Sequence, residues 1–253
     1  MSLPVSNPFS LEGKRVLVTG ASSGIGRAIA VACSRMGSKV IITARNEKRL
    51  DETMSLLFGD GHQLVVADLT EATQRESLVE QLPKLDGIVQ SAGVGSRVPC
   101  KSIEEKDICE IFNPNLIAPI LLQKLLIEEK RINKGASIVF IASMASKYPS
   151  VGNAIYSASK GAVISYAKVL GLELAPRLIR VNCICPAMVW TDLISKNGID
   201  KEVLEEAQLK YPLKRYGTPE DIANLSVFLL SEASSWMTGS CVEINGGGEG
   251  SLI

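Results

Sequence analysis

Short runs of apolar residues recur along the chain, and a segment of helical length follows nearly every one. The runs lie at 16–18, 40–42, 64–66, 88–89, 138–141, 181–184 and 241–244. Most of them are β-branched and continuous rather than alternating, which is typical of strands buried on both faces of a parallel sheet. The pattern predicts seven such strands.

Amphipathic stretches between these runs predict helices. They lie at 25–36, 47–57, 71–82 and 116–132, and a further helix is expected over 156–174. Alternating strands and helices predict an α/β fold, a doubly wound parallel sheet of the Rossmann type in three layers, α/β/α. We find no repeat and no linker, so residues 1–253 are expected to form a single domain.

One segment, 187–218, interrupts this alternation. It contains Asn197-Gly198, Pro212 and Gly217 around a short helical stretch at 201–210. Because it follows the sixth strand, it projects from the carboxyl edge of the sheet, where ligands bind in such folds. We interpret it as a mobile lid over a substrate site.

A glycine-rich turn connects the first strand to the first helix, at Thr19-Gly20-Ala21-Ser22-Ser23-Gly24-Ile25-Gly26. Glycines permit a tight turn there and let backbone amides approach a pyrophosphate at the helix amino terminus. A glycine cluster alone is weak evidence, but its place between strand and helix is the required context. The turn predicts nucleotide binding.

Composition excludes several classes of partner. Lysine plus arginine equals aspartate plus glutamate at 27 each, so there is no basic excess for nucleic acid. The basic residues Lys130, Arg131 and Lys134 are interpreted as a solvated helix end. No apolar run approaches the roughly 18 residues of a membrane helix, and residues 1–10 lack the features of a signal peptide.

The six cysteines include no Cys-x-x-Cys pair. Cys183 and Cys185 stand two apart on an expected strand, which directs them to one face. Without a histidine cluster beside them, buried thiols are favoured over a metal site. Reduced thiols indicate a cytoplasmic protein.

The chain contains one histidine, His62, in a segment with the composition of a surface loop. A Ser-His-Asp hydrolase needs a histidine at its nucleophile, and catalytic zinc usually needs two or three histidine ligands. Both reaction classes are disfavoured.

Tyr156 and Lys160 stand four residues apart where a helix begins, and this spacing puts them on one helix face. A tyrosine of pKa near 10 transfers protons poorly at neutral pH, but a nearby ammonium group favours tyrosinate and lowers that pKa. Ser143 ends the fifth strand, where its hydroxyl could donate to a substrate oxygen. The alternatives are a packing pair on the helix face and an ordinary turn serine.

Taken together, these motifs resemble the short-chain dehydrogenase/reductase family, in its compact single-domain branch. The resemblance covers about Leu11 to Gly247 and includes the family's Thr-Gly-x-x-x-Gly-x-Gly turn. Three of its later motifs each carry one substitution: Ser91 in Asn-Ala-Gly, Ala187 in Pro-Gly-x-x-x-Thr, and Asn245 in Asp-Gly-Gly. None of the three removes a reacting group.

The resemblance implies a catalytic tetrad of Asn115, Ser143, Tyr156 and Lys160, without a metal. Ser143 would polarise a carbonyl, Tyr156 would exchange the proton, and Lys160 would also hold the nicotinamide ribose. Asn115 would order a water that reaches Lys160; its default interpretation is a helix cap, and Asn113 is a nearby decoy. The implied cofactor contacts are Gly20, Ser22, Ser23, Gly24, Ile25, Gly26, Arg45, Asp68, Leu69, Ser91, Ala92, Gly93, Tyr156, Lys160, Pro186, Val189 and Thr191.

The second expected strand ends in Ala44-Arg45, where an NAD enzyme usually carries an acidic residue for the ribose 2′-hydroxyl. Arg45 can form charge-assisted bonds to a 2′-phosphate, so NADP is expected, with NAD as runner-up. Ser23 stands where some NADP-using relatives carry a second basic residue, so the preference is expected to be moderate. The alternative for Arg45 is a solvated residue at the start of the next helix.

The expected function is NADP(H)-dependent hydride transfer between the nicotinamide and an alcohol or carbonyl carbon, with 3-oxoacyl reductases and general carbonyl reductases as the nearest classes. Leu172 stands where the acyl-carrier branch tends to place a basic residue, which disfavours a carrier-bound substrate. The alternatives are a non-catalytic nucleotide-binding scaffold or sensor, and a dehydratase or epimerase of the same fold. The expected substrate lining is Met144, Tyr148, Val151, Val189, Trp190 and Leu193.

Compact relatives associate through the helix after the tyrosine motif and through the last strand, so the resemblance implies a homotetramer. The 156–174 helix agrees, because it carries more apolar positions than one buried face requires. The tail, 249–253, has no evident place in a monomer core.

Overall fold

The computed structural model describes residues 7–195 and 200–248. Its centre is a parallel sheet in the order β3-β2-β1-β4-β5-β6-β7, which confirms the predicted fold class. The strands are β1 Arg15–Thr19, β2 Lys39–Ala44, β3 Gln63–Val66, β4 Leu85–Gln90, β5 Ile132–Ile141, β6 Arg180–Pro186 and β7 Cys241–Ile244.

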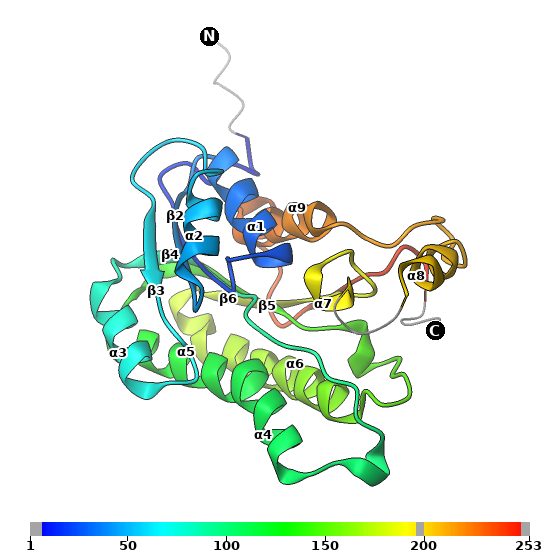
Figure 1. Cartoon of the computed structure of the whole chain (residues 1–253). Helices are drawn as coiled ribbons and strands as arrows, with labels where there is room; N and C mark the ends of the chain where they lie inside the picture. The colour runs from blue at the N-terminus through cyan, green and yellow to red at the C-terminus, as the bar shows by residue number, and fades with distance from the viewer. Residues whose placement is uncertain (1–6, 196–199, 249–253) are drawn as a thin grey trace.

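Helices cover both faces of the sheet (Figure 1). One layer contains α1 (Gly24–Arg35), α2 (Glu47–Met54) and α9 (Pro219–Leu230), and α1 packs directly on α9. The other contains α3 (Ala72–Gln81), α4 (Glu105–Phe112), α5 (Ala118–Glu128) and α6 (Ala154–Leu174). The three layers predicted from the sequence are therefore present.

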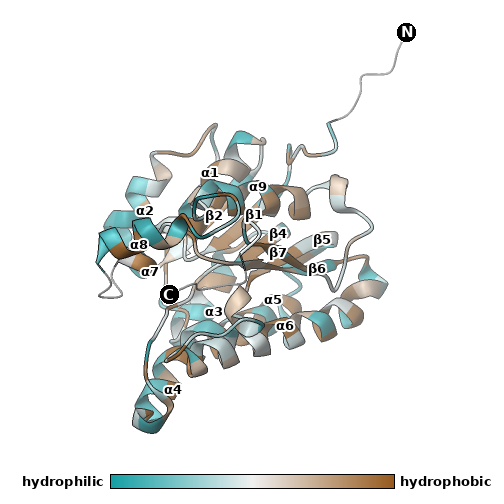
Figure 2. Cartoon of the chain, turned by 90° about the vertical axis from the view of Figure 1, so that its right-hand side faces the viewer, coloured by the Kyte–Doolittle hydropathy of each residue, from teal (hydrophilic) through white to brown (hydrophobic). Residues whose placement is uncertain are grey.

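The inner strands β1, β2, β4, β5 and β6 are apolar because each of their faces meets a helix layer, whereas the edge strands β3 and β7 are only partly buried. In β1, Leu17 joins the core beneath α5 and α6, while Val16 and Val18 join the core beneath α1 and α9. All three are fully buried. Figure 2 shows the largely apolar strands between the two layers of helices. Burial on two faces explains why the runs are continuous rather than alternating.

The expected helix over 116–132 is wrong at both ends. Residues Asn113–Ile117 form a π-helical turn, and α5 ends at Glu128. Lys130 then takes a positive φ of 52°, and Ile132 already pairs with Leu85 in the sheet. The chain needs this reversal to bring β5 beside β4.

The basic group at 130–134 is consequently no solvated helix end. Arg131 is half-buried, and its guanidinium donates to the Leu82 carbonyl at 2.7 Å. Lys134 lies within β5.

His62 is also more than a surface residue. It is half-buried, its Nδ1 accepts from the Val40 backbone N–H at 3.0 Å, and its Nε2 lies 2.9 Å from the Phe58 carbonyl. These contacts fix the loop before β3 against the start of β2, which is a structural role.

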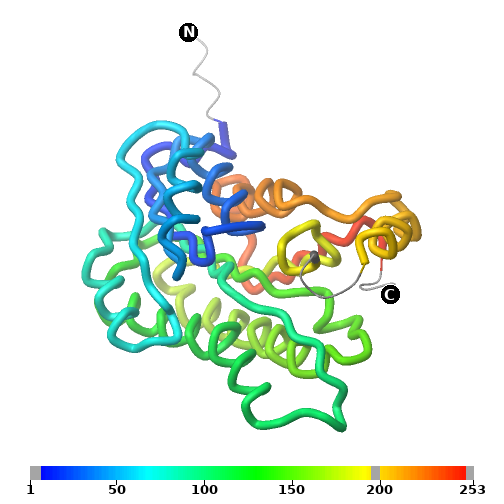
Figure 3. Tube along the Cα trace, viewed as in Figure 1, coloured from blue at the N-terminus to red at the C-terminus, as the bar shows by residue number. Residues whose placement is uncertain are grey.

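The segment 187–218 stands apart from the two helix layers, at the right of Figure 3. It contains α7 (Asp192–Ser195) and α8 (Lys201–Gln208) and has a small apolar core of its own, around Tyr211 and Tyr216. A bridge between Val189 and Gly217 ties its two ends together at the sheet edge. Asn197-Gly198 and the tail at 249–253 lie outside the described residues.

Candidate active site

A pocket of about 940 Å³ opens at the carboxyl ends of the strands. It lies where the strand order reverses between β1 and β4, the place where α/β sheets of this kind bind ligands. Every residue expected to contact the cofactor lines this pocket, and so does Ser143, whereas Asn115 lies behind its wall. The structure thus brings together residues spread from 20 to 191.

The glycine-rich turn forms one end of the pocket. Gly20 takes a φ of +67°, and a Cβ there would lie 2.7 Å from the Ala92 α-carbon. The Thr19 hydroxyl accepts from the backbone N–H groups of Ser91 and Ala92, at 3.0 and 3.1 Å. This places the ends of β1 and β4 in direct contact.

Helix α1 begins at this turn and directs its amino terminus at the pocket. Ser23, at the N-cap, has an extended backbone and makes no side-chain capping bond. Unsatisfied N–H groups of a helix start, together with its dipole, bind phosphate oxygens. The turn therefore has the shape and the donors that a cofactor pyrophosphate requires.

The far end of the pocket is basic. Arg45 is largely exposed, and its guanidinium lies 3.8 Å from the Asp68 carboxylate. Partial burial works against ionisation of Asp68, but hydrogen bonds from Thr70 and the charge of Arg45 outweigh it and lower the pKa of Asp68. Asp68 is thus held in its charged form beside Arg45.

Sequence reasoning missed a second arginine here. Arg49, on α2, lines the pocket and forms an ion pair of 2.6 Å with Asp192 on α7. The pair joins the α2 side of the pocket to the segment 187–218. Its partners stand 143 positions apart, so no local pattern could have indicated it.

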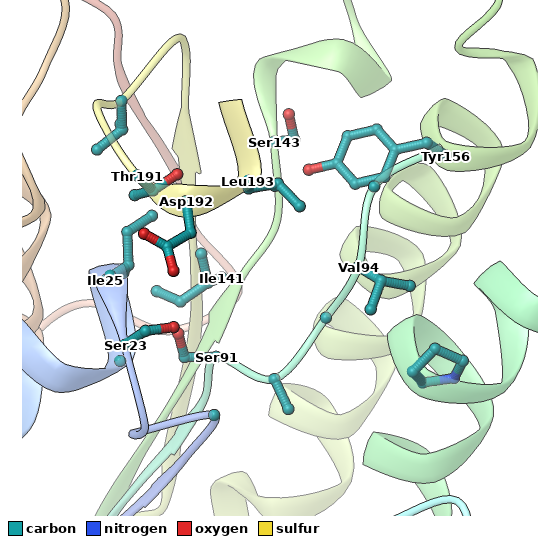
Figure 4. A pocket seen from close by; sticks show the side chains of 18 of the residues that line it. Ser23, Ile25, Ser91, Val94, Ile141, Ser143, Tyr156, Thr191, Asp192 and Leu193 are labelled. Atoms are coloured by element: carbon teal, nitrogen blue, oxygen red, sulfur yellow. The ribbon is translucent and has the colours of Figure 1, made fainter. Parts of the chain in front are cut away.

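Ser143 and Tyr156 face the opposite end of the pocket (Figure 4). Ser143 follows β5, and its Oγ accepts from the Ala145 backbone N–H at 3.1 Å, while its hydroxyl also forms a hydrogen bond with Tyr156. Lys160 lies one helical turn after Tyr156 on α6, with its Nζ 5.8 Å from the Tyr156 ring centre. Lys160 is buried, and its Nζ donates to the Ile141 carbonyl at 2.9 Å.

The expected effect of Lys160 on the tyrosine pKa is not present in this structure. Burial raises the pKa of Tyr156, and the hydrogen bond with Ser143 offsets only part of that rise. Burial also lowers the pKa of Lys160 to about 8, against a smaller opposing effect of Cys183 and Cys185. Burial therefore dominates the pKa values of both groups.

Asn115 belongs to the π-helical turn and is no helix cap. Its side-chain amide donates to the Val94 carbonyl at 2.9 Å and accepts from the Val94 N–H at 2.8 Å. The amide also lies 3.2 Å from the Ser159 hydroxyl. A Cβ on Gly93 would lie 3.0 Å from Asn115 Oδ1 and 3.4 Å from Lys160 Nζ, so both groups flank one backbone position. The decoy Asn113 is exposed.

The three substituted motif positions keep their local geometry. Ser91 is held through its backbone by Thr19, as described above. Ala187 donates its N–H to the Ile244 carbonyl at 3.1 Å without a left-handed φ. Asn245 accepts from the Gly247 N–H at 3.1 Å, which preserves the turn.

The substrate side of the pocket is more polar than expected. Met144, Tyr148, Val189 and Leu193 do line it. Trp190 does not, because its indole N–H donates to Gln208 at 3.1 Å and its ring packs on Tyr216.

Val151 does not line the pocket either, since it is 93% exposed. Four polar residues that sequence reasoning missed take part instead: Ser96, Arg97, Ser150 and Asn153. They lie in loops after β4 and β5, which carry no periodic pattern.

The described residues contain neither a metal-binding cluster nor a membrane-spanning helix. Within residues 7–195 and 200–248, no group of three or more His, Cys, Asp or Glu side chains could hold a metal ion. In the same part of the chain, no helix has the length and apolar character needed to cross a membrane.

Comparisons with known proteins agree with this geometry. Residues 20–249 match the family model described as enoyl-(acyl carrier protein) reductase. The chain is 34% identical over 239 residues to the 3-oxoacyl-[acyl-carrier-protein] reductase FabG of Rickettsia felis, covering 94% of this chain and 98% of that protein. It is also 34% identical over 244 residues to human dehydrogenase/reductase SDR family member 4, covering 94% and 88%.

Solved structures show the same fold. A short-chain dehydrogenase/reductase described as a glucose/ribitol dehydrogenase, from Brucella melitensis, superposes with a TM-score of 0.88 at 33% identity, covering 95% of this chain and 98% of that one. A Beutenbergia cavernae protein, provisionally named an NAD(P)-dependent gluconate 5-dehydrogenase, superposes with a TM-score of 0.85 at 33% identity, over 95% and 98%. That structure holds NADP at low occupancy. The chain belongs to the short-chain dehydrogenase/reductase family and is an NAD(P)-dependent oxidoreductase.

Proposed function

We propose that the protein transfers a hydride between NADP(H) and an alcohol or carbonyl carbon, as a single-domain carbonyl reductase or alcohol dehydrogenase. The observation that carries the proposal is the position of Ser143, Tyr156 and Lys160 on one side of a pocket whose other end is the glycine-rich turn. When bound there, the nicotinamide supplies or accepts the hydride.

Each of the three residues has a distinct task in this proposal. Ser143 donates its hydroxyl hydrogen to the substrate oxygen in place of Tyr156, which stabilises developing negative charge. Tyr156, beside it, gives or takes the proton at that oxygen. Lys160, with a pKa of about 8, is mostly protonated at neutral pH and stabilises the tyrosinate formed when the proton leaves.

Asn115 is proposed as the positioning residue of a proton path. Its Oδ1 and Lys160 Nζ flank Gly93, so one water there could contact both. Its two bonds to Val94 fix the amide in place, which is what a fixed water site needs.

We further propose NADP(H) as the preferred cofactor. Ala44 offers no carboxylate to repel a 2′-phosphate, and Arg45 and Arg49 both line that end of the pocket. One hydrogen bond to a charged group is worth about 1.5–3 kcal/mol, or roughly 10–100-fold in affinity. NAD(H) is the runner-up, because the ion pair with Asp68 already offsets part of the positive charge of Arg45.

The substrate class we favour is a small, free carbonyl compound or alcohol. Ser96, Arg97, Ser150 and Asn153 make the outer part of the pocket polar. Leu172, where the acyl-carrier branch tends to place a basic residue, is 75% exposed and apolar, which disfavours docking of an acidic carrier. The segment 187–218 is proposed as the lid, with Leu193 directed at the catalytic end (Figure 4).

A homotetramer is proposed as the assembly. Val169 and Leu172 on α6 are 54% and 75% exposed, although they lie on a helix whose opposite face is buried. Exposed apolar residues on one helix face are typical of an interface. The six cysteines are free thiols, and the cytoplasm is the compartment we propose.

Replacing Tyr156 with phenylalanine tests the proposed chemistry against a non-catalytic scaffold. The variant should lose turnover on a panel of carbonyls and alcohols while binding NADPH almost normally, because only the titrating hydroxyl is removed. Acid–base catalysis is typically worth 10²–10⁴-fold, so retention of more than about a tenth of the rate would contradict the proposal. Tyr166→Phe, outside the pocket on the same helix, is the matched control.

The cofactor proposal is tested by dissociation constants of NADPH and NADH, measured from the fluorescence of the reduced nicotinamide. Arg45→Ala should weaken NADPH binding about 10-fold or more and leave NADH nearly unchanged. Lys48→Ala removes the same charge from an exposed position outside the pocket and should change neither constant. Tighter NADH binding by the wild type would refute the preference.

A further inference from the structure

Three cysteines gather behind the catalytic residues, at the edge of the sheet. Cys183 and Cys185 lie on β6 and are almost fully buried. Cys241 begins the neighbouring edge strand β7 and packs against the same core cluster as the other two. The three thiols therefore share one face of the sheet, the face that α6 covers.

The sheet register pairs Cys183 directly with Cys241. Neighbouring strands lie about 4.8 Å apart, which falls within the Cα separations of roughly 4.4–6.8 Å that a disulfide spans. Both side chains leave the sheet on the same side, because paired positions share a face. The two thiols lie within hydrogen-bonding reach of each other.

The electrostatics of the pair favour reaction at Cys241. A hydrogen bond from the Cys183 thiol, with the charge of Lys168, lowers the pKa of Cys241 to about 6. The same hydrogen bond and burial raise the pKa of Cys183. The half-buried Cys241 is therefore the more accessible and the more readily ionised thiol of the pair, and Cys183 is buried beside it.

We propose that Cys241 and Cys183 form a reversible disulfide when the protein meets a hydroperoxide, and that this modification slows the enzyme. The Cys241 thiolate attacks the terminal peroxide oxygen, the O–O bond breaks, and the alkoxide or hydroxide that leaves takes up a proton from solvent to become alcohol or water. Cys241 is then a sulfenic acid. Cys183 attacks its sulfur, a disulfide forms, and water departs. Two thiols are oxidised and one peroxide is reduced, with no further reactant.

Two contacts connect this pair to the proposed chemistry. Cys183 and Cys185 both lie close enough to the buried ammonium group of Lys160 to affect its pKa. The Ser143 backbone N–H donates to Cys185, which stands two residues from Cys183 on the same strand. A bridge at Cys183 changes the surroundings of both catalytic side chains. Association through the edge strand would shield the pair from bulky reagents, but not from hydrogen peroxide, which is close to water in size.

The test treats the reduced full-length protein with hydrogen peroxide and reads its intact mass. We expect a loss of two hydrogen atoms, reversed by dithiothreitol, and a cross-link between peptides containing Cys183 and Cys241. Fragmentation distinguishes Cys183 from Cys185. Cys241→Ser should abolish the cross-link, while Cys109→Ser, which removes an exposed thiol on α4, should leave it intact.

Several outcomes would overturn the proposal: no cross-link, oxygen addition to Cys241 without a cross-link, or bridges confined to Cys100 and Cys109. Turnover of the oxidised wild type should fall at least threefold and recover on reduction, and the Cys241→Ser enzyme should keep its rate under the same treatment. A cross-linked enzyme with unchanged turnover would overturn the connection to the active site. Because the cross-link is read by mass, it stands or falls independently of the proposed reaction.

Discussion

Two glycines, both inside helices, should respond to alanine in opposite directions. A Cβ on Gly26, in the first turn of α1, would lie 2.3 Å from the Gly20 carbonyl oxygen. A Cβ on Gly161, in α6, would meet nothing closer than Ser146 Cβ at 3.9 Å. The added methyl group therefore clashes with backbone atoms in α1 and has free space in α6.

The magnitudes follow from these distances. At Gly26, helix and turn must separate by about 1 Å to reach an ordinary contact, and overpacking of this kind costs about 1–3 kcal/mol. Alanine's better helix propensity, about 1 kcal/mol, offsets part of this only if the helix stays regular. We expect a net loss of about 2 kcal/mol for Gly26→Ala and a gain of about 0.5–1 kcal/mol for Gly161→Ala.

Thermal unfolding followed by circular dichroism measures both effects. At about 2–4 °C per kcal/mol for a chain of this size, Tm should fall by about 4–8 °C for Gly26→Ala and rise by about 1–4 °C for Gly161→Ala. NADPH should also bind Gly26→Ala at least tenfold more weakly, because the displaced turn carries the phosphate donors. Wild-type Tm and NADPH affinity in Gly26→Ala would refute the reasoning.

Three other expectations concern single side chains. Asn115→Ala should cost about 2–4 kcal/mol in chemical denaturation, because it leaves both backbone groups of Val94 unpaired, while the exposed Asn113→Ala should change stability by less than about 0.5 kcal/mol; equal effects would contradict the assignment. The folded pKa of Lys160, about 8, lies below its ordinary 10.5, so the unfolded chain binds more protons between these values and wild-type stability should rise with pH relative to Lys160→Met. If the difference in unfolding free energy between wild type and Lys160→Met stays constant from pH 8 to 10.5, the pKa of Lys160 is not depressed. Light scattering should return a tetramer mass at micromolar concentration, and Leu172→Glu should reduce it, whereas a wild-type monomer would remove that proposal.

Periodic and motif-bound features were predictable from the sequence. The seven strands were found because burial on two faces leaves continuous apolar runs. The glycine-rich turn was found because Gly20 and Gly26 meet backbone atoms at distances that allow no side chain. The spacing of these glycines in the sequence therefore follows from the close packing of the turn.

Features that depend on contacts between distant residues were not predictable. The ion pair of Arg49 with Asp192 joins residues that share no local pattern. The position of Trp190 in the sequence predicts a pocket residue. Its hydrogen bond to Gln208 instead holds it against the small apolar core of segment 187–218. The pKa of Tyr156 also depends on how much water reaches its hydroxyl, a property of the folded site.

The π-helical turn at Asn113–Ile117 sets a limit on how the chain can change in length. Such a turn holds one residue more than an α-helical turn, and here it runs directly between α4 and α5. Deleting one residue would restore the α-helical ladder but rotate α4 by about 100° relative to α5, and Ile111 would leave the core. Gly59, in the loop before β3, has open space around it, so an insertion at that position is tolerated, whereas the count of residues between 105 and 128 is fixed by geometry.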